Sequence, residues 1–139
     1  MKLQTLFFSL LLSLTLNWQA LAEIKTFGNI SVDVPTGWVS QEHAPGVILT
    51  SPDASTAVTI TKGSSQGKTL AAFAQDGAKE INGAQPQKIG DKIYAFEAST
   101  SGTHVFMMVK DIDGKNFVVV MVTGNFLHRD LDGIVSSLK

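Results

Sequence analysis

Residues 103–124, THVFMMVKDIDGKNFVVVMVTG, decide the fold, because they hold two long apolar runs separated by a turn signal. Val105 to Val109 and Phe117 to Val122 are apolar at consecutive positions, which predicts strands covered on both faces. Asp113-Gly114 between them is typical of a tight type I′ turn. We therefore expect an antiparallel hairpin at the centre of a sheet, with Val119 buried there.

Two amphipathic helices are expected to cover that sheet. Apolar side chains recur at helical spacing in residues 70–81, with Thr69 as the N-cap and Asn82-Gly83 as the stop signal. A second apolar stripe starts at Leu127 and continues to the C-terminus, with Asn125 as its candidate cap. These two segments predict one helix on each face of the sheet.

Shorter segments with alternating apolar side chains supply the remaining strands. Residues 23–62 have the strand and turn pattern of an antiparallel meander, and residues 91–99, DKIYAFEAS, predict a further strand. The expected fold class is α+β: a three-layer α/β/α sandwich whose central antiparallel sheet has about six strands. Residues 23–139 are of the usual size for a single domain, and the chain has no cysteine for disulfides.

The order and spacing of these segments resemble the PsbP-like superfamily. That group includes an extrinsic subunit of photosystem II, a Ran-binding import factor and bacterial envelope proteins of the DcrB type. The resemblance implies an α/β/α sandwich and a protein that binds other proteins or assists assemblies. It rests on the segments VDVPTGW (32–38), TSPDASTAVTITKG (50–63), TLAAFAQDGAKEINGA (69–84), GDKIYAFEAS (90–99), VKDIDGKNFVVVMVTGN (109–125) and LDGIVSSLK (131–139).

The first 22 residues have the pattern of a signal peptide. Lys2 precedes an apolar run from Leu6 to Leu16, and Ala20-Leu21-Ala22 offers small residues at the two positions that signal peptidase recognises. The run is shorter than the roughly 20 apolar residues of a membrane-spanning helix. We expect cleavage after Ala22, which would leave residues 23–139 in the periplasm or secreted, without a membrane span.

Neither the charge balance nor the histidines point to a nucleic acid, a metal or a cofactor. The chain has 11 basic and 12 acidic residues, a balance that does not favour nucleic-acid binding. His43, His104 and His128 fall in different predicted elements, without the spacing that would pre-arrange metal ligands. Residues 111–116, DIDGKN, lack the glycine and glutamate positions of a calcium loop.

Gly63-Ser64-Ser65-Gln66-Gly67 matches the G-x-S-x-G nucleophile elbow of α/β-hydrolases. In that elbow a helix begins directly behind the serine, whereas Gly67, Lys68 and the expected cap Thr69 intervene here. The elbow also follows a parallel strand of a larger sheet. We therefore interpret Ser65 as a loop residue and expect no enzymatic activity.

The function expected from these observations is a non-enzymatic role: an exported soluble protein that binds another envelope or secreted protein, in an accessory, assembly or immunity-type role. Trp38 and His43, expected near one another after a turn, are the candidate partner-binding residues.

One alternative to partner binding is a periplasmic protein that binds a small apolar ligand. The residues that could line its pocket are Met107 and Met108, together with the aromatic residues Phe96, Phe106, Phe117 and Phe126. The other alternative is a serine hydrolase that uses Ser65. The sequence does not name the partner or predict the oligomeric state.

Overall fold

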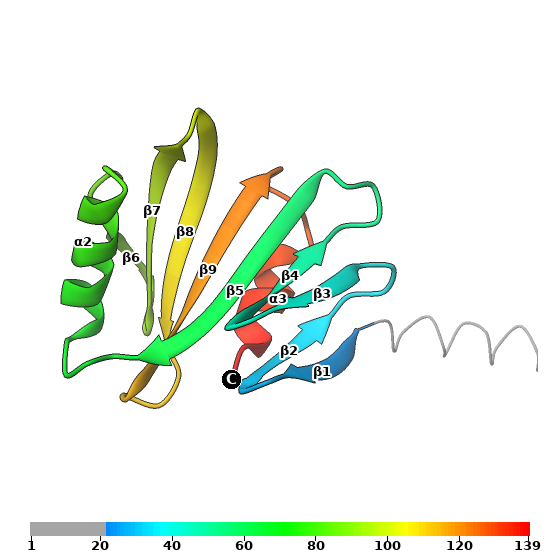
Figure 1. Cartoon of the computed structure of the whole chain (residues 1–139), viewed down its shortest axis with the longest axis horizontal. Coiled ribbons are helices and arrows are strands. Elements are labelled where there is room, and N and C mark those ends of the chain that lie inside the picture. Colours follow the sequence, from blue (N-terminus) through cyan, green and yellow to red (C-terminus); the bar gives the residue numbers. More distant parts are fainter. Residues whose placement is uncertain (1–21) are drawn as a thin grey trace, which may run out of the picture.

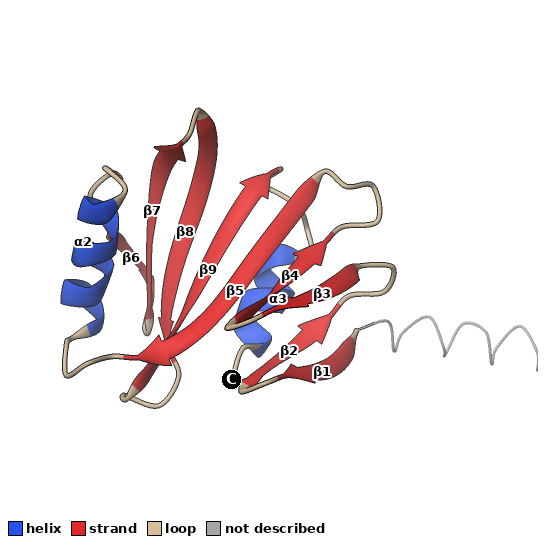
Figure 2. Cartoon of the chain, in the orientation of Figure 1, coloured by secondary structure: helices blue, strands red, loops and turns tan. Residues whose placement is uncertain are grey.

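The computed structural model describes residues 22–139, and strands account for half of that part of the chain (Figures 1 and 2). The predicted signal peptide, apart from Ala22, lies outside the described residues. The elements are, in order, β1 (Glu23–Phe27), β2 (Ile30–Val34), β3 (Val39–His43), β4 (Gly46–Thr50), β5 (Thr56–Ser64), α2 (Leu70–Glu80), β6 (Gln87–Gly90), β7 (Ile93–Thr100), β8 (Thr103–Asp111), β9 (Asn116–Gly124) and α3 (Leu131–Ser137).

Seven of the strands form one antiparallel sheet in the order β3-β4-β5-β9-β8-β7-β6. The predicted central position of the 103–124 hairpin is confirmed, because β9 is the fourth of the seven strands and pairs with β5 and β8. The prediction of about six strands was too low. The meander prediction for residues 23–62 was wrong at its start, since β1 and β2 form a separate two-stranded sheet.

The main core lies on one face of β9. Val118, Val120 and Val122 are fully buried there, in one cluster with Ile134 of α3 and Val32 of β2. Successive side chains of a strand point to opposite faces, so these three valines lie on a single face of the sheet. Residues far apart in sequence, from β2 to α3, therefore share this core.

The opposite face of β9 is less completely buried. Phe117 packs with Ala74 of α2 and Val109 of β8, and its ring meets that of Phe73 edge-on. Val119, however, is only half-buried, and so is Met121. The expectation that both faces of β9 are covered, with Val119 in the core, was therefore wrong.

The turn between β8 and β9 is wider than predicted. Residues 112–115 separate the strands, and of Asp113 and Gly114 only Gly114 has a positive φ, at 80°. A type I′ turn needs positive φ at both central residues, so this turn belongs to another class. The Asp113 carboxylate instead accepts hydrogen bonds from the amides of Lys115 and Asn116, which hold the four-residue loop in shape.

Helix α2 begins and ends close to where the sequence predicts. The Thr69 hydroxyl accepts a hydrogen bond from an amide of the first turn, as an N-cap does. Asn82, with φ of 53°, and Gly83 end the helix, and the Gly83 amide donates to the Ala78 carbonyl at 2.7 Å. A Cβ at Gly83 would lie 2.8 Å from the Phe96 ring, so glycine also permits close packing on β7.

Helix α3 begins six residues after the predicted cap. The Asn125 side chain accepts from the Leu127 amide in a turn before the helix, and Leu127 is 91% exposed. The helix starts at Leu131, with Asp130 at the N-cap position. The apolar stripe predicted from Leu127 therefore holds only from Leu131 onward.

The end of α3 is fixed by a lysine from the sheet. Lys110 Nζ of β8 donates to the carbonyls of Val135 at 2.8 Å, Ser136 at 3.2 Å and Leu138 at 3.4 Å. A cation at a helix C-terminus is favourable because the last carbonyls lack partners within the helix. Burial lowers the pKa of Lys110 from its usual value. Sheet and helix are thus joined by a polar contact as well as by the core.

A pair of substitutions in β9 tests this assignment of faces. Val120→Asp should destabilise the fold by more than about 4 kcal/mol, because it places a carboxylate without a partner in the main core. Val119→Asp, at a half-buried position where the carboxylate can reach water, should cost only about 1–2 kcal/mol. Thermal unfolding followed by circular dichroism measures both. Equal losses would contradict the assignment.

Candidate functional site

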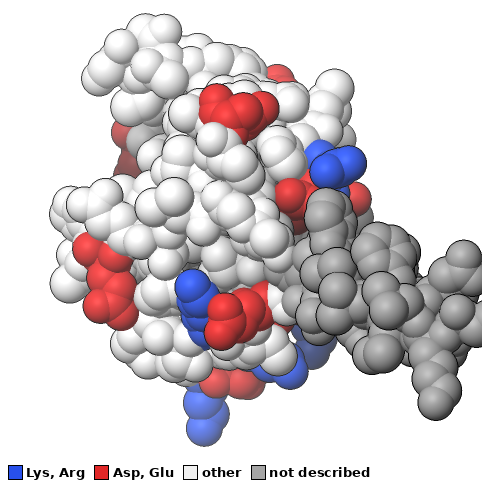
Figure 3. Space-filling model, turned by 90° about the vertical axis from the view of Figure 1, so that its right-hand side faces the viewer, with Lys and Arg blue, Asp and Glu red and all other residues white. Residues whose placement is uncertain are grey.

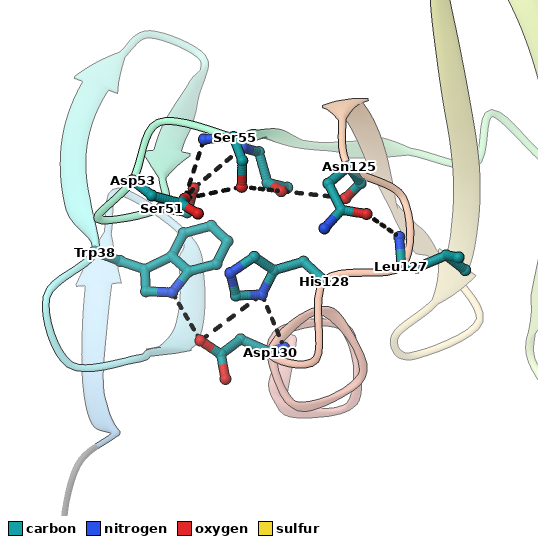
Figure 4. Close-up of polar contacts among 9 residues, drawn as sticks. Trp38, Ser51, Asp53, Ser55, Asn125, Leu127, His128 and Asp130 are labelled. Carbon is teal, nitrogen blue, oxygen red and sulfur yellow. Dashed lines mark hydrogen bonds and ion pairs between the residues drawn. The ribbon is translucent and has the colours of Figure 1, made fainter.

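Trp38, the first candidate partner-binding residue, is buried immediately before β3. Its indole is 6% exposed and belongs to the main core. The indole Nε1 donates to Asp130 Oδ2 at 2.9 Å, and the ring meets His128 edge-on with centroids 5.1 Å apart (Figure 4). Trp38 therefore joins the entry of β3 to the turn before α3.

The turn before α3 is arranged around His128 and Asp130. The Asp130 amide donates to His128 Nδ1 at 3.1 Å, and that nitrogen lies 3.9 Å from the Asp130 carboxylate (Figure 4). Because the carboxylate accepts from Trp38, it makes no capping hydrogen bond to α3. Asp130 therefore stands at the N-cap position of α3 but uses its carboxylate to bind Trp38.

His43, the second candidate partner-binding residue, lies at the opposite end of β3 from Trp38. It is exposed and pairs with Gly46 across the β3–β4 hairpin. The structure therefore does not bring Trp38 and His43 together into one site. Trp38 belongs to the core and His43 to the surface of an edge strand.

A second polar cluster shapes the turn between β4 and β5. The Asp53 carboxylate accepts hydrogen bonds from the Ser55 amide and from the hydroxyls of Ser51 and Ser55 (Figure 4). These donors, the Ser55 amide first, lower the pKa of Asp53 to about 2. The Thr56 hydroxyl donates to the Asn125 carbonyl and links this turn to the end of β9. The contacts of this cluster hold the turn in shape and do not form a separate site.

The three histidines lie in separate places, as their spacing predicts. His104 at the start of β8 lies 3.7 Å from the Glu97 carboxylate, and its ring is tilted against that of Phe126, with centroids 5.3 Å apart. Within residues 22–139, no three His, Cys, Asp or Glu side chains gather as metal ligands would. Likewise, no helix of this part is long and apolar enough to cross a membrane.

The sheet carries a partly uncovered face on strands β3, β4, β5 and β9, which we call the open face. It is the side of the sheet that α2 covers at β7, β8 and Phe117 at the start of β9. In Figure 1, α3 lies behind β5 and β4, and no described element lies in front of them. The open face consists of Val39, Gln41, His43, Ile48, Thr50, Ala57, Thr59, Thr61, Val119, Met121 and Thr123.

The open face has an unusual character for a surface in contact with water. On β4, β5 and β9 its members are apolar residues and threonines, and the edge strand β3 adds Gln41 and His43. Val39, Gln41 and His43 are exposed, and the other members are half-buried. The consecutive apolar residues of β9 were the sequence signal for this face. They predicted that other parts of the chain would cover it, but none of the described residues does so completely.

A groove of about 300 Å³ runs between α2 and the sheet, beside the open face, and we call it the α2 groove. Its floor consists of Phe96, Met107, Val109 and Val119. Phe73, Gly77 and Ile81 form the helix side. Met107 thus lines a groove, as the sequence suggested for the Met107-Met108 pair, whereas Met108 belongs to the main core on the other face.

The polar rim of the α2 groove is partly neutralised. Lys68 Nζ donates to Asp76 at 2.7 Å, and this contact lowers the pKa of Asp76. Glu80, on the same rim, makes no hydrogen bond or ion pair with any other residue that the structure describes. One uncompensated carboxylate therefore remains at the mouth of the groove.

Gly77 lies in the middle of α2, at a position where close packing does not require a glycine. A Cβ there would lie 4.0 Å from the Phe96 ring, an ordinary contact, so alanine would fit. Glycine in a helix interior costs about 1 kcal/mol relative to alanine. This cost is not offset by closer packing, and its structural consequence is a wider α2 groove.

Ser65 is buried in the connection between β5 and α2. Its amide donates to the Lys115 carbonyl at 2.8 Å, and its carbonyl accepts from the Lys68 amide at 3.0 Å. Among the described residues, no histidine hydrogen-bonds to the Ser65 hydroxyl. Positive φ values follow at Gln66 and Gly67, so the helix does not start behind the serine as it does in an elbow.

Substitution of Ser65 tests the hydrolase alternative. We expect a fluorophosphonate probe to label the wild-type protein no more than it labels Ser65→Ala, because the hydroxyl lacks a general base. Gel fluorescence of the two proteins after labelling measures this. Stoichiometric labelling that disappears in Ser65→Ala would show that Ser65 is a nucleophile.

Comparisons with known proteins give structural likeness only. No protein-family model and no curated protein sequence matches the chain. The solution structure of cyanobacterial PsbP (CyanoP) from Synechocystis sp. PCC 6803 matches with a TM-score of 0.51 at 12% identity, covering 86% of this chain and 92% of that one. The crystal structure of LpqN, involved in cell envelope biogenesis of Mycobacterium tuberculosis, matches with a TM-score of 0.38 at 12% identity, covering 84% of each chain. The match to CyanoP shows that the chain has a PsbP-like fold.

Proposed function

We propose that this chain is an exported, soluble, non-enzymatic protein that binds another envelope or secreted protein through the open face of its sheet. The observation that carries the proposal is the open face itself. Strands β4, β5 and β9 present half-buried apolar and threonine side chains there, β3 continues the face at the edge, and no described element covers them. Contiguous apolar surface of this kind marks interaction sites in monomeric soluble proteins.

The layering of the fold supports the same proposal. Ala74 of α2 clusters with Phe117, and Ile134 of α3 clusters with Val118, which is the adjacent residue of β9. We infer from this alternation that the helices lie on opposite faces and that the fold has three layers. The α2 layer is then incomplete over β3, β4, β5 and β9. A partner element would complete it.

The geometry and charge of the open face define the partner's chemistry. Four strands at a spacing of about 4.8 Å span enough width for one helix of about 10 Å diameter. Because the part of the face on β4, β5 and β9 has no acidic or basic residue, we expect the partner to present an apolar surface there, without buried charges. At the β1–β3 end, Figure 3 shows acidic and basic residues scattered among neutral ones, which gives no strong charge for steering.

Export and the lack of catalysis are parts of the proposal that rest on separate observations. The signal-peptide pattern of residues 1–22 supports export to the periplasm or the medium after cleavage following Ala22. The absence of a histidine partner for Ser65 in the described part supports a binding role. An accessory, assembly or immunity-type role would each use such a surface.

A lysine at the centre of the open face tests the proposal. Thr59 is half-buried between Ile48 and Met121, and Thr59→Lys adds a charge that an apolar partner cannot cover. Affinity capture from the source organism's envelope fraction should recover a specific partner with the wild-type protein. Recovery with Thr59→Lys should fall at least about tenfold.

The matched control is Thr26→Lys, which makes the same chemical change at an exposed position on β1. It should recover the partner as well as the wild-type protein does, and both variants should keep the circular dichroism spectrum of the fold. The proposed function would be contradicted if Thr59→Lys recovered as much partner as the wild-type protein. It would also be contradicted if no protein were enriched by the wild-type protein relative to Thr59→Lys.

A further inference from the structure

We propose that the α2 groove is a separate binding site for a small organic cation that has an apolar chain. The groove shares Val119 with the open face, but it differs from that face because it is enclosed on one side by α2 and has its own polar rim. Its volume of about 300 Å³ is at the small end of the range for ligand sites, so a single short chain suits it.

The groove has the composition of a ligand site. Phe96, Met107 and Val119 provide an apolar floor, and Phe73 and Ile81 an apolar wall. Aromatic and methionine side chains adapt well to an apolar ligand. These residues would bind the chain of the ligand by removing it from water.

Gly77 is the second observation that points to an occupant. An alanine at this position would meet only an ordinary contact with Phe96, and it would make α2 more stable. Packing therefore does not explain the glycine, whereas a need for open space in the groove does. A larger side chain here would occupy the middle of the groove beside the helix wall.

The charges at the rim select the head group. Lys68 is already paired with Asp76 at 2.7 Å, so it contributes little attraction for an anion. The carboxylate of Glu80 has no partner in the part of the chain that the structure describes. The rim thus carries one net negative charge, which favours a cationic head group and disfavours a fatty-acid carboxylate.

The experiment uses two probes with the same chain length and opposite charge, octyltrimethylammonium and octyl sulfate, below their micelle concentrations. The mature protein carries methyl-labelled methionines at 107, 108 and 121, observed by NMR. Met107 lines the α2 groove, Met121 belongs to the open face, and Met108 is in the core. Saturable shifts of the Met107 methyl with the cation, larger than those of Met108 and Met121, are the expected result.

Four variants locate the site and its charge. Gly77→Leu fills the groove with a good helix former and should weaken binding of the cation at least about tenfold. Gly133→Leu, the same change in α3 where a Cβ meets nothing within 4 Å, should bind as the wild-type protein does. Glu80→Gln should weaken binding about two- to five-fold, as for an exposed ion pair, whereas Glu42→Gln on β3 should have no effect.

Each outcome decides one part of the proposal. Equal affinity for the cation and the sulfate, or an unchanged affinity in Glu80→Gln, would overturn the assigned head group. Binding that survives Gly77→Leu, or the lack of a saturable Met107 shift with either probe, would overturn the site. A shift confined to Met121 would place the probe on the open face and also overturn this proposal, without bearing on whether a protein docks there.

Discussion

The rest of the structure depends on strand β9, because its side chains are fully buried on one face of the sheet and incompletely buried on the other. Val118, Val120 and Val122 point into the main core, where side chains of β2 and α3 cover them completely. Burial of a valine-sized side chain contributes about 1.5–3 kcal/mol to the free energy of unfolding. Contacts at these positions therefore hold β2 and α3 onto the sheet. Phe117 and Val119 point to the other side, where α2 covers the first but not the second.

The ends of the described chain follow from this arrangement. The C-terminal segment packs its apolar residues on β9, Lys110 of β8 binds the last carbonyls of α3, and Lys139 pairs through its backbone with Ser31 of β2. Trp38 then closes the same side through its contact with Asp130. The face of β9 that carries Val118, Val120 and Val122 is therefore closed by intramolecular contacts, and the partly uncovered surface lies on its other face.

The sequence predicted those parts of the fold whose signals are local. Apolar spacing and the Thr69 cap placed α2, and the apolar run of 117–122 placed β9 at the sheet centre. The separate β1–β2 sheet and the late start of α3 were not predictable, since both depend on contacts across the fold, such as the use of Asp130 by Trp38. Consecutive apolar residues likewise show that a strand is apolar on both sides, but they do not show whether this chain or another molecule covers them. The α2 groove was anticipated only through Met107 and Phe96, because its other lining residues meet them through tertiary packing.

The central claim is that the two faces of β9 differ in cover, and methionine oxidation tests it most directly. Oxidation of methionine to its sulfoxide depends on exposure of the sulfur. Met107 and Met121 are half-buried on the side of the open face and the α2 groove, whereas their neighbour Met108 is buried in the main core. Brief peroxide treatment of the mature protein, followed by tandem mass spectrometry, should convert Met107 and Met121 several-fold faster than Met108. Equal protection of all three methionines would show that the face is covered and would contradict the account.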